Sequence, residues 1–144
     1  DLAEKLLEPL AGVDTKQISK KKIIDGKEYW CLYLGIAKDL RQRIHWHACQ
    51  KHSPSAVKHG FLSTLRQSIS ALLGLDQTMS AADVSDVLEK CYWDWCPTAT
   101  KGDAEDIEKE QLSSEYFPIN IQGNKSVDPA VIKRLKELRK KHKK

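Results

Sequence analysis

Residues 33–47 read Tyr33-Leu34-Gly35-Ile36-Ala37-Lys38-Asp39-Leu40-Arg41-Gln42-Arg43-Ile44-His45-Trp46-His47. The stretch begins at the end of an apolar, strand-like segment and turns at Gly35 into a basic segment with helical character. Asp39 falls in the first turn of the expected helix, where a carboxylate suits the positive end of the helix dipole. Arg43 and His47 are four residues apart, so a helix places them on one face. The stretch therefore predicts a strand, a turn and a helix that presents a guanidinium beside an imidazole.

Bulk composition narrows the class of protein. The chain has 144 residues, the length of one ordinary domain, with 40% hydrophobic and 31% charged residues. No apolar run approaches the ~20 residues that cross a bilayer, and no signal-peptide pattern opens the chain. Because the first residue is Asp1 and the only methionine is Met79, we expect a processed or excised piece of a longer product. Four cysteines without disulfide-dense or paired zinc spacing predict reduced thiols in a cytoplasmic protein.

The net charge of +4 is distributed unevenly. Residues 131–144 contain eight Lys or Arg and one Glu, which gives +7, so the first 130 residues sum to −3. This asymmetry suggests a domain over 1–130 followed by a basic helix or tail over 131–144. Such a segment is suited to contact phosphates; the alternative is a solvated terminus.

The pattern of apolar residues and turn signals predicts a mixed fold. Residues 17–25 and 27–34 flank Asp25-Gly26, a dipeptide that favours a type I′ hairpin turn. Aromatic and polar residues alternate over 90–96, which predicts a third strand ended by Pro97. Helices are expected over residues 2–10, 37–51, 61–75, 80–88 and 104–116, and after Asp128-Pro129. The expected class is α/β (α+β), a small three-stranded antiparallel sheet flanked by helices.

The quoted stretch resembles the second half of the signature of the GIY-YIG nuclease superfamily. There the pattern runs Tyr-(Ile/Val)-Gly, then Arg about ten residues after the Tyr, and His four after the Arg. Tyr33, Gly35, Arg43 and His47 occupy these positions. The first half, Gly-Ile-Tyr, is not evident upstream, where residues 20–24 read Lys-Lys-Lys-Ile-Ile. The general base attributed to that first Tyr is then replaced by Tyr29, by a Lys, or by no group.

The resemblance implies an endonuclease that hydrolyses DNA phosphodiester bonds with one Mg²⁺ or Mn²⁺ ion. In the family the metal ligand is a Glu about twelve residues before a Pro-x-Asn-type ending. Glu108 lies twelve residues before Asn120, in a helix whose core face is expected to include Ile107 and Leu112. Glu108 is thus the expected ligand, with Glu110 as the alternative.

The other site residues follow from the same resemblance. Arg43 is expected to contact the phosphate as a planar, always-charged donor, with Arg41 as the competing candidate. Tyr33 and His47 are expected to position the attacking water. Weaker candidates for nucleic-acid contacts are Lys38, Arg41, Arg66 and Asn120.

Three other interpretations compete with this one. A zinc site at His45, His47, Cys49 and His52 is disfavoured, because His45 and His47 lie about 200° apart on a helix and no second cluster supplies ligands. The missing first Tyr points to a degenerate relative that binds nucleic acid without cutting it. A protein-interaction domain with Trp46 or Trp93 as anchors is the third possibility.

Overall fold

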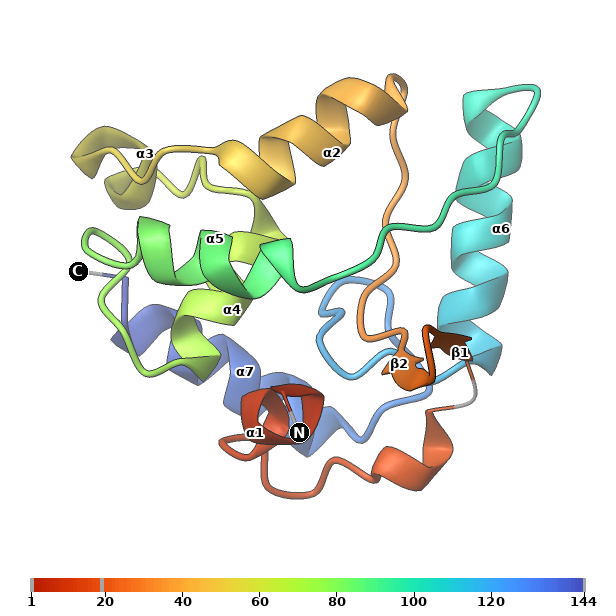
Figure 1. The fold of residues 1–144 in the computed structure, drawn as a ribbon, viewed down its shortest axis with the longest axis horizontal. Coiled ribbons are helices and arrows are strands. Elements are labelled where there is room, and N and C mark those ends of the chain that lie inside the picture. Colours follow the sequence, from red (N-terminus) through yellow and green to blue (C-terminus); the bar gives the residue numbers. More distant parts are fainter. Residues whose placement is uncertain (1, 19, 144) are drawn as a thin grey trace.

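The computed structural model describes residues 2–18 and 20–143 and consists of helices around one short hairpin (Figure 1). In chain order its elements are α1 (Leu2–Leu7), η1 (Thr15–Gln17), β1 (Lys21–Ile24), β2 (Lys27–Trp30), α2 (Leu40–Cys49), α3 (Pro54–Lys58), α4 (Thr64–Leu72), α5 (Ala81–Glu89), α6 (Lys101–Ser114) and α7 (Pro129–Lys141). The mixed class expected from the sequence is confirmed.

The hairpin forms where the sequence predicts it. β1 pairs antiparallel with β2, and Ile24 lies opposite Lys27 across the turn. Asp25 and Gly26 both have positive φ, 51° and 77°, as a type I′ turn requires. β1 begins later than expected because residues 15–17 form a 3₁₀ turn, capped by the Asp14 carboxylate, which accepts from the Lys16 amide at 3.1 Å.

The second strand is shorter than predicted, ending at Trp30 rather than Leu34. After Trp30, backbone groups of Leu32 and Leu34 form hydrogen bonds with residues 119–120, which are distant in the sequence. Leu32 O accepts from the Ile119 amide at 3.2 Å. The Asn120 side chain accepts from Leu34 N and donates to Leu34 O, both at 2.8 Å. An amide side chain thus takes the place of a neighbouring strand, and the coil of residues 31–39 leads into α2.

The predicted third strand is wrong. Residues 91–98 have no regular secondary structure, and the sheet in the described part of the chain has two strands. This segment meets the hairpin through side chains instead: the ring of Tyr92 lies edge-on to Tyr29 at 4.8 Å, and Asp94 pairs with Lys22 at 3.7 Å. The alternating aromatic pattern therefore reflects side-chain contacts and not a ladder of backbone hydrogen bonds.

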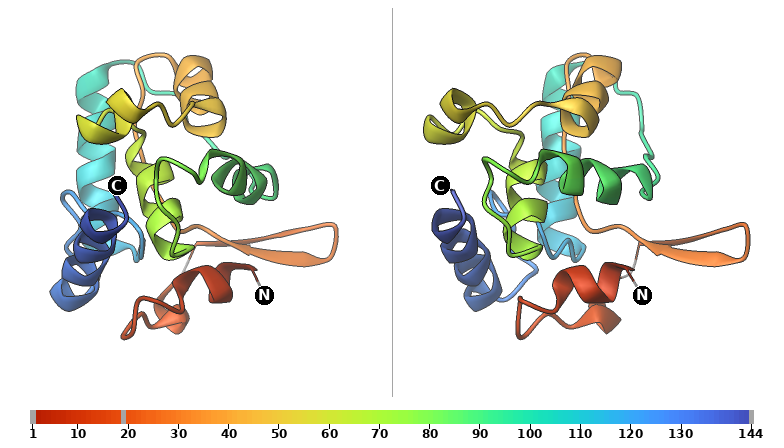
Figure 2. Two further views of the ribbon diagram at one scale, coloured as in Figure 1. Left: turned by 90° about the vertical axis from the view of Figure 1, so that its left-hand side faces the viewer. Right: turned by 60° about the vertical axis from the view of Figure 1, so that its left-hand side comes forward.

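The core lies among α1, α4, α5 and α7. Every residue from Leu65 to Leu72 of α4 is buried, so this helix is central. Figures 1 and 2 show α7 lying beside α4. α7 buries Val131, Leu135 and Leu138, with at most 6% of each side chain exposed. The basic C-terminal segment is thus a packed helix with a charged outer face, stabilised by roughly 1.5–3 kcal/mol for each buried apolar side chain.

Helix α6 is set apart from α2 and α4, and in Figure 1 the coil of residues 31–39 runs between them. Leu112 anchors α6 and is 3% exposed. Ile107, expected on the core face, is 39% exposed, so that expectation is wrong. No helix in the described residues is both long and apolar enough to cross a membrane.

Candidate active site

Two of the predicted site residues meet at the start of α4. Ser63 caps this helix, and its hydroxyl forms a hydrogen bond with Nδ1 of His47. The hydroxyl of the next residue, Thr64, is bonded to the Tyr33 hydroxyl at 3.0 Å. The rings of Tyr33 and His47 lie 6.0 Å apart and nearly perpendicular. The strand end and the basic helix therefore bring a phenol and an imidazole together against one helix terminus.

Local hydrogen bonds fix the helix that carries His47. The Asp39 carboxylate caps α2, accepting from the Gln42 amide at 3.1 Å. At the other end, Gln50 accepts from the Ser63 amide at 2.7 Å and donates to Phe61 O at 3.0 Å. These bonds tie the end of α2 to the start of α4, which sets the position of His47 relative to Ser63.

His47 is only 7% exposed and is surrounded by aromatic rings. Trp93 stacks on it at 6.2 Å, and Trp46 lies at 5.3 Å. Burial, together with the positive charges of Arg43 and Arg66, lowers the pKa of His47 to about 4. At neutral pH the ring is uncharged, so it acts through hydrogen bonds and does not neutralise a phosphate. Trp46 and Trp93 are half-buried by these contacts, unlike the exposed anchors of an interaction domain.

Arg43 lies one helical turn before His47 and is exposed. Its guanidinium carbon sits 4.9 Å from the centroid of the Trp46 ring, a cation–π geometry that orients the side chain while leaving its N–H groups accessible. In the described part of the chain Arg43 has no carboxylate partner. It is therefore free to bind a phosphate.

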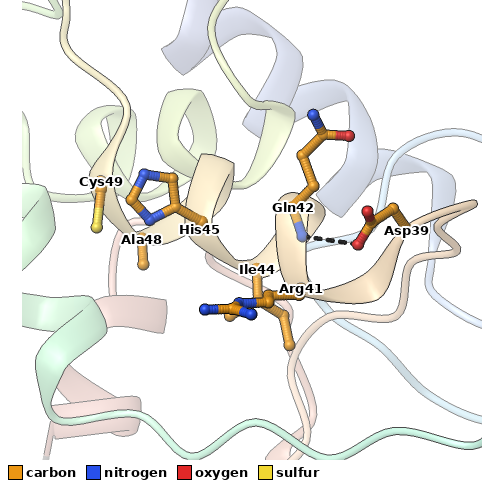
Figure 3. A pocket seen from close by; sticks show the side chains of 7 residues that line it. All are labelled: Asp39, Arg41, Gln42, Ile44, His45, Ala48 and Cys49. Carbon is orange, nitrogen blue, oxygen red and sulfur yellow. Dashed lines mark hydrogen bonds between the residues drawn. The ribbon is translucent and has the colours of Figure 1, made fainter.

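The competing candidate, Arg41, faces a different side of α2. It lines a shallow depression of about 500 Å³ with His45, Cys49 and four other residues of α2 and its cap, as Figure 3 shows. Two residues along a helix rotate the side chain by about 200°, so this depression and Arg43 lie on different faces. Lys38 is exposed in the turn that precedes α2.

Glu108 lies on the inward side of α6. It is half-buried together with Ala104 and Gln111, one turn on either side, whereas Glu110 is exposed. Burial raises the pKa of Glu108, and the negative charge of Glu105 raises it as well. No hydrogen bond or ion pair within residues 2–18 and 20–143 joins Glu108 to Tyr33, Arg43 or His47. The structure thus favours Glu108 over Glu110 as the inward carboxylate. It shows no direct bond between Glu108 and the other three predicted catalytic residues.

Arg66, predicted to contact nucleic acid, is fully buried. All five of its guanidinium N–H groups are used. They donate to His52 Nε2 (2.9 Å), His47 O (3.0 Å), Ala48 O (3.1 Å), Ala81 O (2.9 Å) and Ser85 Oγ (3.0 Å). Two of these acceptors are carbonyls of the last turn of α2, which lack helical partners and carry the negative end of its dipole. Arg66 therefore caps α2 from inside the protein and has no N–H group left for DNA.

Asn120 is likewise 6% exposed, with its amide committed to Leu34. Its position supports the coil that carries Tyr33 and does not present the amide to a ligand. Arg66 and Asn120 therefore have structural roles in this fold. Arg66 stabilises the helix that carries His47, and Asn120 stabilises the coil that carries Tyr33.

The four side chains of the alternative zinc site, His45, His47, Cys49 and His52, lie in separate environments. His52 is buried, with Nδ1 donating to Gln77 O at 2.8 Å and Nε2 accepting from Arg66. His45 and Cys49 line the depression on the other face of α2 from His47. Among the described residues no three His, Cys, Asp or Glu side chains form a group able to hold a metal ion.

Three residues next to the predicted site residues were not predicted as part of the site from the sequence: Ser63, Thr64 and Gln67. Gln67 lies one turn after Ser63 and Thr64 on α4, and its Oε1 accepts from Arg139 Nη2 at 2.7 Å. A signal existed for the first two, because Ser-Thr before an apolar helix is typical of a helix start. Arg139 belongs to the basic segment 131–144, which was expected to suit phosphate contacts, but its bond to Gln67 depends on the packing of α7 against α4 and has no local signal.

Comparison with known proteins assigns this architecture to a family. Residues 7–141 match the family model described as the GIY-YIG catalytic domain. No curated protein and no solved structure matches in the corresponding comparisons. The family match includes the coil that carries Tyr33, helix α2 with Arg43 and His47, and helix α6 with Glu108. The chain belongs to the GIY-YIG catalytic domain family, a family of nucleases.

Proposed function

We propose that this domain is a metal-dependent endonuclease that hydrolyses DNA phosphodiester bonds by attack of water on phosphorus, with one metal ion. The observation that carries the proposal is the pairing of Tyr33 and His47 at the start of α4, with the exposed Arg43 one turn away on α2. Phosphodiester hydrolysis requires a positioned water and a fixed cation for the developing charge. In a chain of this nuclease family, these three side chains suit those two tasks.

The donor chemistry of the site is compatible with Mg²⁺ or Mn²⁺. Mg²⁺ keeps several waters and is held by one or two carboxylates together with substrate phosphate oxygens, so a full protein cage is not needed. Glu108 is half-buried, and its pKa is raised first by that burial and also by the nearby negative charge of Glu105. A bound cation would relieve that repulsion. Glu108 is the proposed ligand, and the ion would supply Lewis-acid stabilisation of the phosphate oxygens.

Each remaining residue has a defined task. Arg43 donates N–H groups to the non-bridging oxygens of the scissile phosphate, where its exposure and its contact with Trp46 favour a fixed approach. The Tyr33 hydroxyl and the uncharged His47 ring position the attacking water. His47 keeps Nε2 for this purpose, because Nδ1 is bonded to Ser63.

DNA outside the scissile phosphate is proposed to contact basic surface residues. Lys38 and Arg41 are exposed at the start of α2, and the outer face of α7 exposes Lys133, Lys136 and Lys140. Neutralisation of phosphates by such residues provides most of the sequence-independent affinity of DNA-binding proteins.

Supercoiled plasmid tests the function. The purified protein should convert it to nicked and linear forms with Mg²⁺ or Mn²⁺, and EDTA should abolish the conversion. Protein that binds the plasmid without cutting it under all these conditions would instead be the degenerate binder suggested by the missing first Tyr.

A further inference from the structure

The face of α4 that holds Tyr33 also holds an arginine from the far end of the chain. Tyr33 reaches Thr64 at 3.0 Å, and Arg139 of α7 reaches Gln67 at 2.7 Å. Thr64 and Gln67 are three residues apart, so they lie on one face of α4, separated by about one helical turn of ~5 Å. The Tyr33 hydroxyl and the Arg139 guanidinium are therefore neighbours on the same helix face.

The guanidinium of Arg139 is held in place and is not saturated. Gln67 is itself fixed, because its Nε2 donates to Leu62 O at 2.7 Å while its Oε1 accepts from Arg139. Within the described residues the other N–H groups of Arg139 have no protein acceptor, in contrast to Arg66, whose N–H groups are all used. Arg139 is half-buried, whereas its helix neighbours Arg134 and Lys140 are exposed. It thus combines a fixed position with free donors.

Electrostatics agree with this geometry. Burial lowers the pKa of Arg139, and interaction with the Tyr33 phenol opposes that shift. An arginine remains charged in proteins, so the result is a persistent cation beside the Tyr33 hydroxyl. Partial burial weakens solvent screening, which strengthens the attraction of this cation for an anion.

We infer that Arg139 is a second phosphate-binding arginine of the active site, in addition to Arg43, and that it reaches the substrate beside Tyr33. This inference rests on the proposed nuclease function and assigns to the C-terminal helix a direct contact with the DNA backbone at the scissile region. The contact replaces the one predicted for Arg66, which is occupied inside the protein.

Binding and cleavage of a labelled DNA duplex test this assignment, with Arg139→Gln, Arg139→Lys and the exposed arginine variant Arg134→Gln. Binding is measured against salt concentration in EDTA, so no cleavage occurs. Arg139→Gln should reduce the slope of log K against log salt by about 0.9, the value for one lost phosphate contact, and Arg139→Lys should restore it. Single-turnover cleavage at saturating DNA should fall at least tenfold in both variants, because Lys cannot make a bidentate contact. Arg134→Gln should cleave at the wild-type rate.

The outcomes separate this inference from the proposed function. Wild-type protein that binds but does not cut contradicts the nuclease function, while the salt slope still decides the Arg139 contact. An unchanged slope together with an unchanged rate in Arg139→Gln would overturn the inference. If Arg139→Gln does not fold, as judged by thermal unfolding, Arg139→Lys decides: a wild-type cleavage rate in that variant overturns it. Wild-type protein without affinity for duplex DNA overturns both.

Discussion

Replacing Arg43 with Ala should reduce the single-turnover rate of DNA cleavage by more than a hundredfold. Arg43 is exposed, lies over the Trp46 ring at 4.9 Å and has no ion-pair partner among the described residues, so its free N–H groups are available to the phosphate. Removing one preorganised donor to a developing negative charge typically costs ~10²–10³ in rate. Rates at saturating DNA with Mg²⁺ measure the effect, since saturation separates loss of chemistry from loss of affinity.

Arg41 provides the discriminating comparison. It lies on a different face of α2, in the depression shown in Figure 3. Arg41→Ala should weaken binding a few-fold and leave most of the cleavage rate at saturation. If Arg41→Ala lost the activity and Arg43→Ala kept it, the phosphate-binding role would move to Arg41.

Replacing Arg66 with Leu should lower the free energy of unfolding by about 3–5 kcal/mol, because several acceptors lose their donor and each buried unsatisfied acceptor costs about 1–3 kcal/mol. The substitution removes five hydrogen bonds, including those to the buried carbonyl of His47 and the partly buried carbonyls of Ala48 and Ala81. Since a domain is stable by only ~5–15 kcal/mol, a large fraction of the protein should unfold under mild conditions. Urea denaturation followed by far-UV circular dichroism measures the difference.

Two comparisons make this prediction specific. Arg134→Leu, on the exposed side of α7, should change the free energy of unfolding by less than about 0.5 kcal/mol, as surface substitutions usually do. Arg66→Lys should lower the free energy of unfolding by an amount between these two values, because an ammonium offers three donors in place of five. A loss below about 1 kcal/mol for Arg66→Leu would show that the network around Arg66 does not hold α2, α4 and α5 together.

Local chemistry was sufficient to predict several features of the fold. Asp25-Gly26 specified its turn because Gly adopts positive φ without steric cost and Asp tolerates it. Asp128 and Pro129 marked the start of α7, where the Asp128 carboxylate accepts from the Ala130 amide at 2.9 Å. The resemblance to the GIY-YIG signature, and not local chemistry, predicted a shared site for Tyr33, Arg43 and His47; in the structure the rings of Tyr33 and His47 lie 6.0 Å apart.

The features that sequence analysis missed depend on contacts between distant segments. The strand predicted through Leu34 fails because Asn120, 86 positions away, satisfies its backbone. The segment around Tyr92 has strand-like alternation, yet within residues 2–18 and 20–143 its backbone pairs with no strand. Arg66 did carry a signal: it follows Leu62 by four residues and precedes Ile69 by three, which places it on the apolar face of α4.

The most direct test of the account compares plasmid cleavage by the wild-type protein with cleavage by Glu108→Gln and Glu110→Gln across a range of Mg²⁺ concentrations. Glu108 is the inward carboxylate of α6, and Glu110 is exposed on the same helix. If Glu108 holds the ion, Glu108→Gln should lose more than a hundredfold in rate. The rate of Glu110→Gln should match that of the wild type. Equal rates for Glu108→Gln and the wild type, or a loss confined to Glu110→Gln, would contradict the assignment of the metal to Glu108.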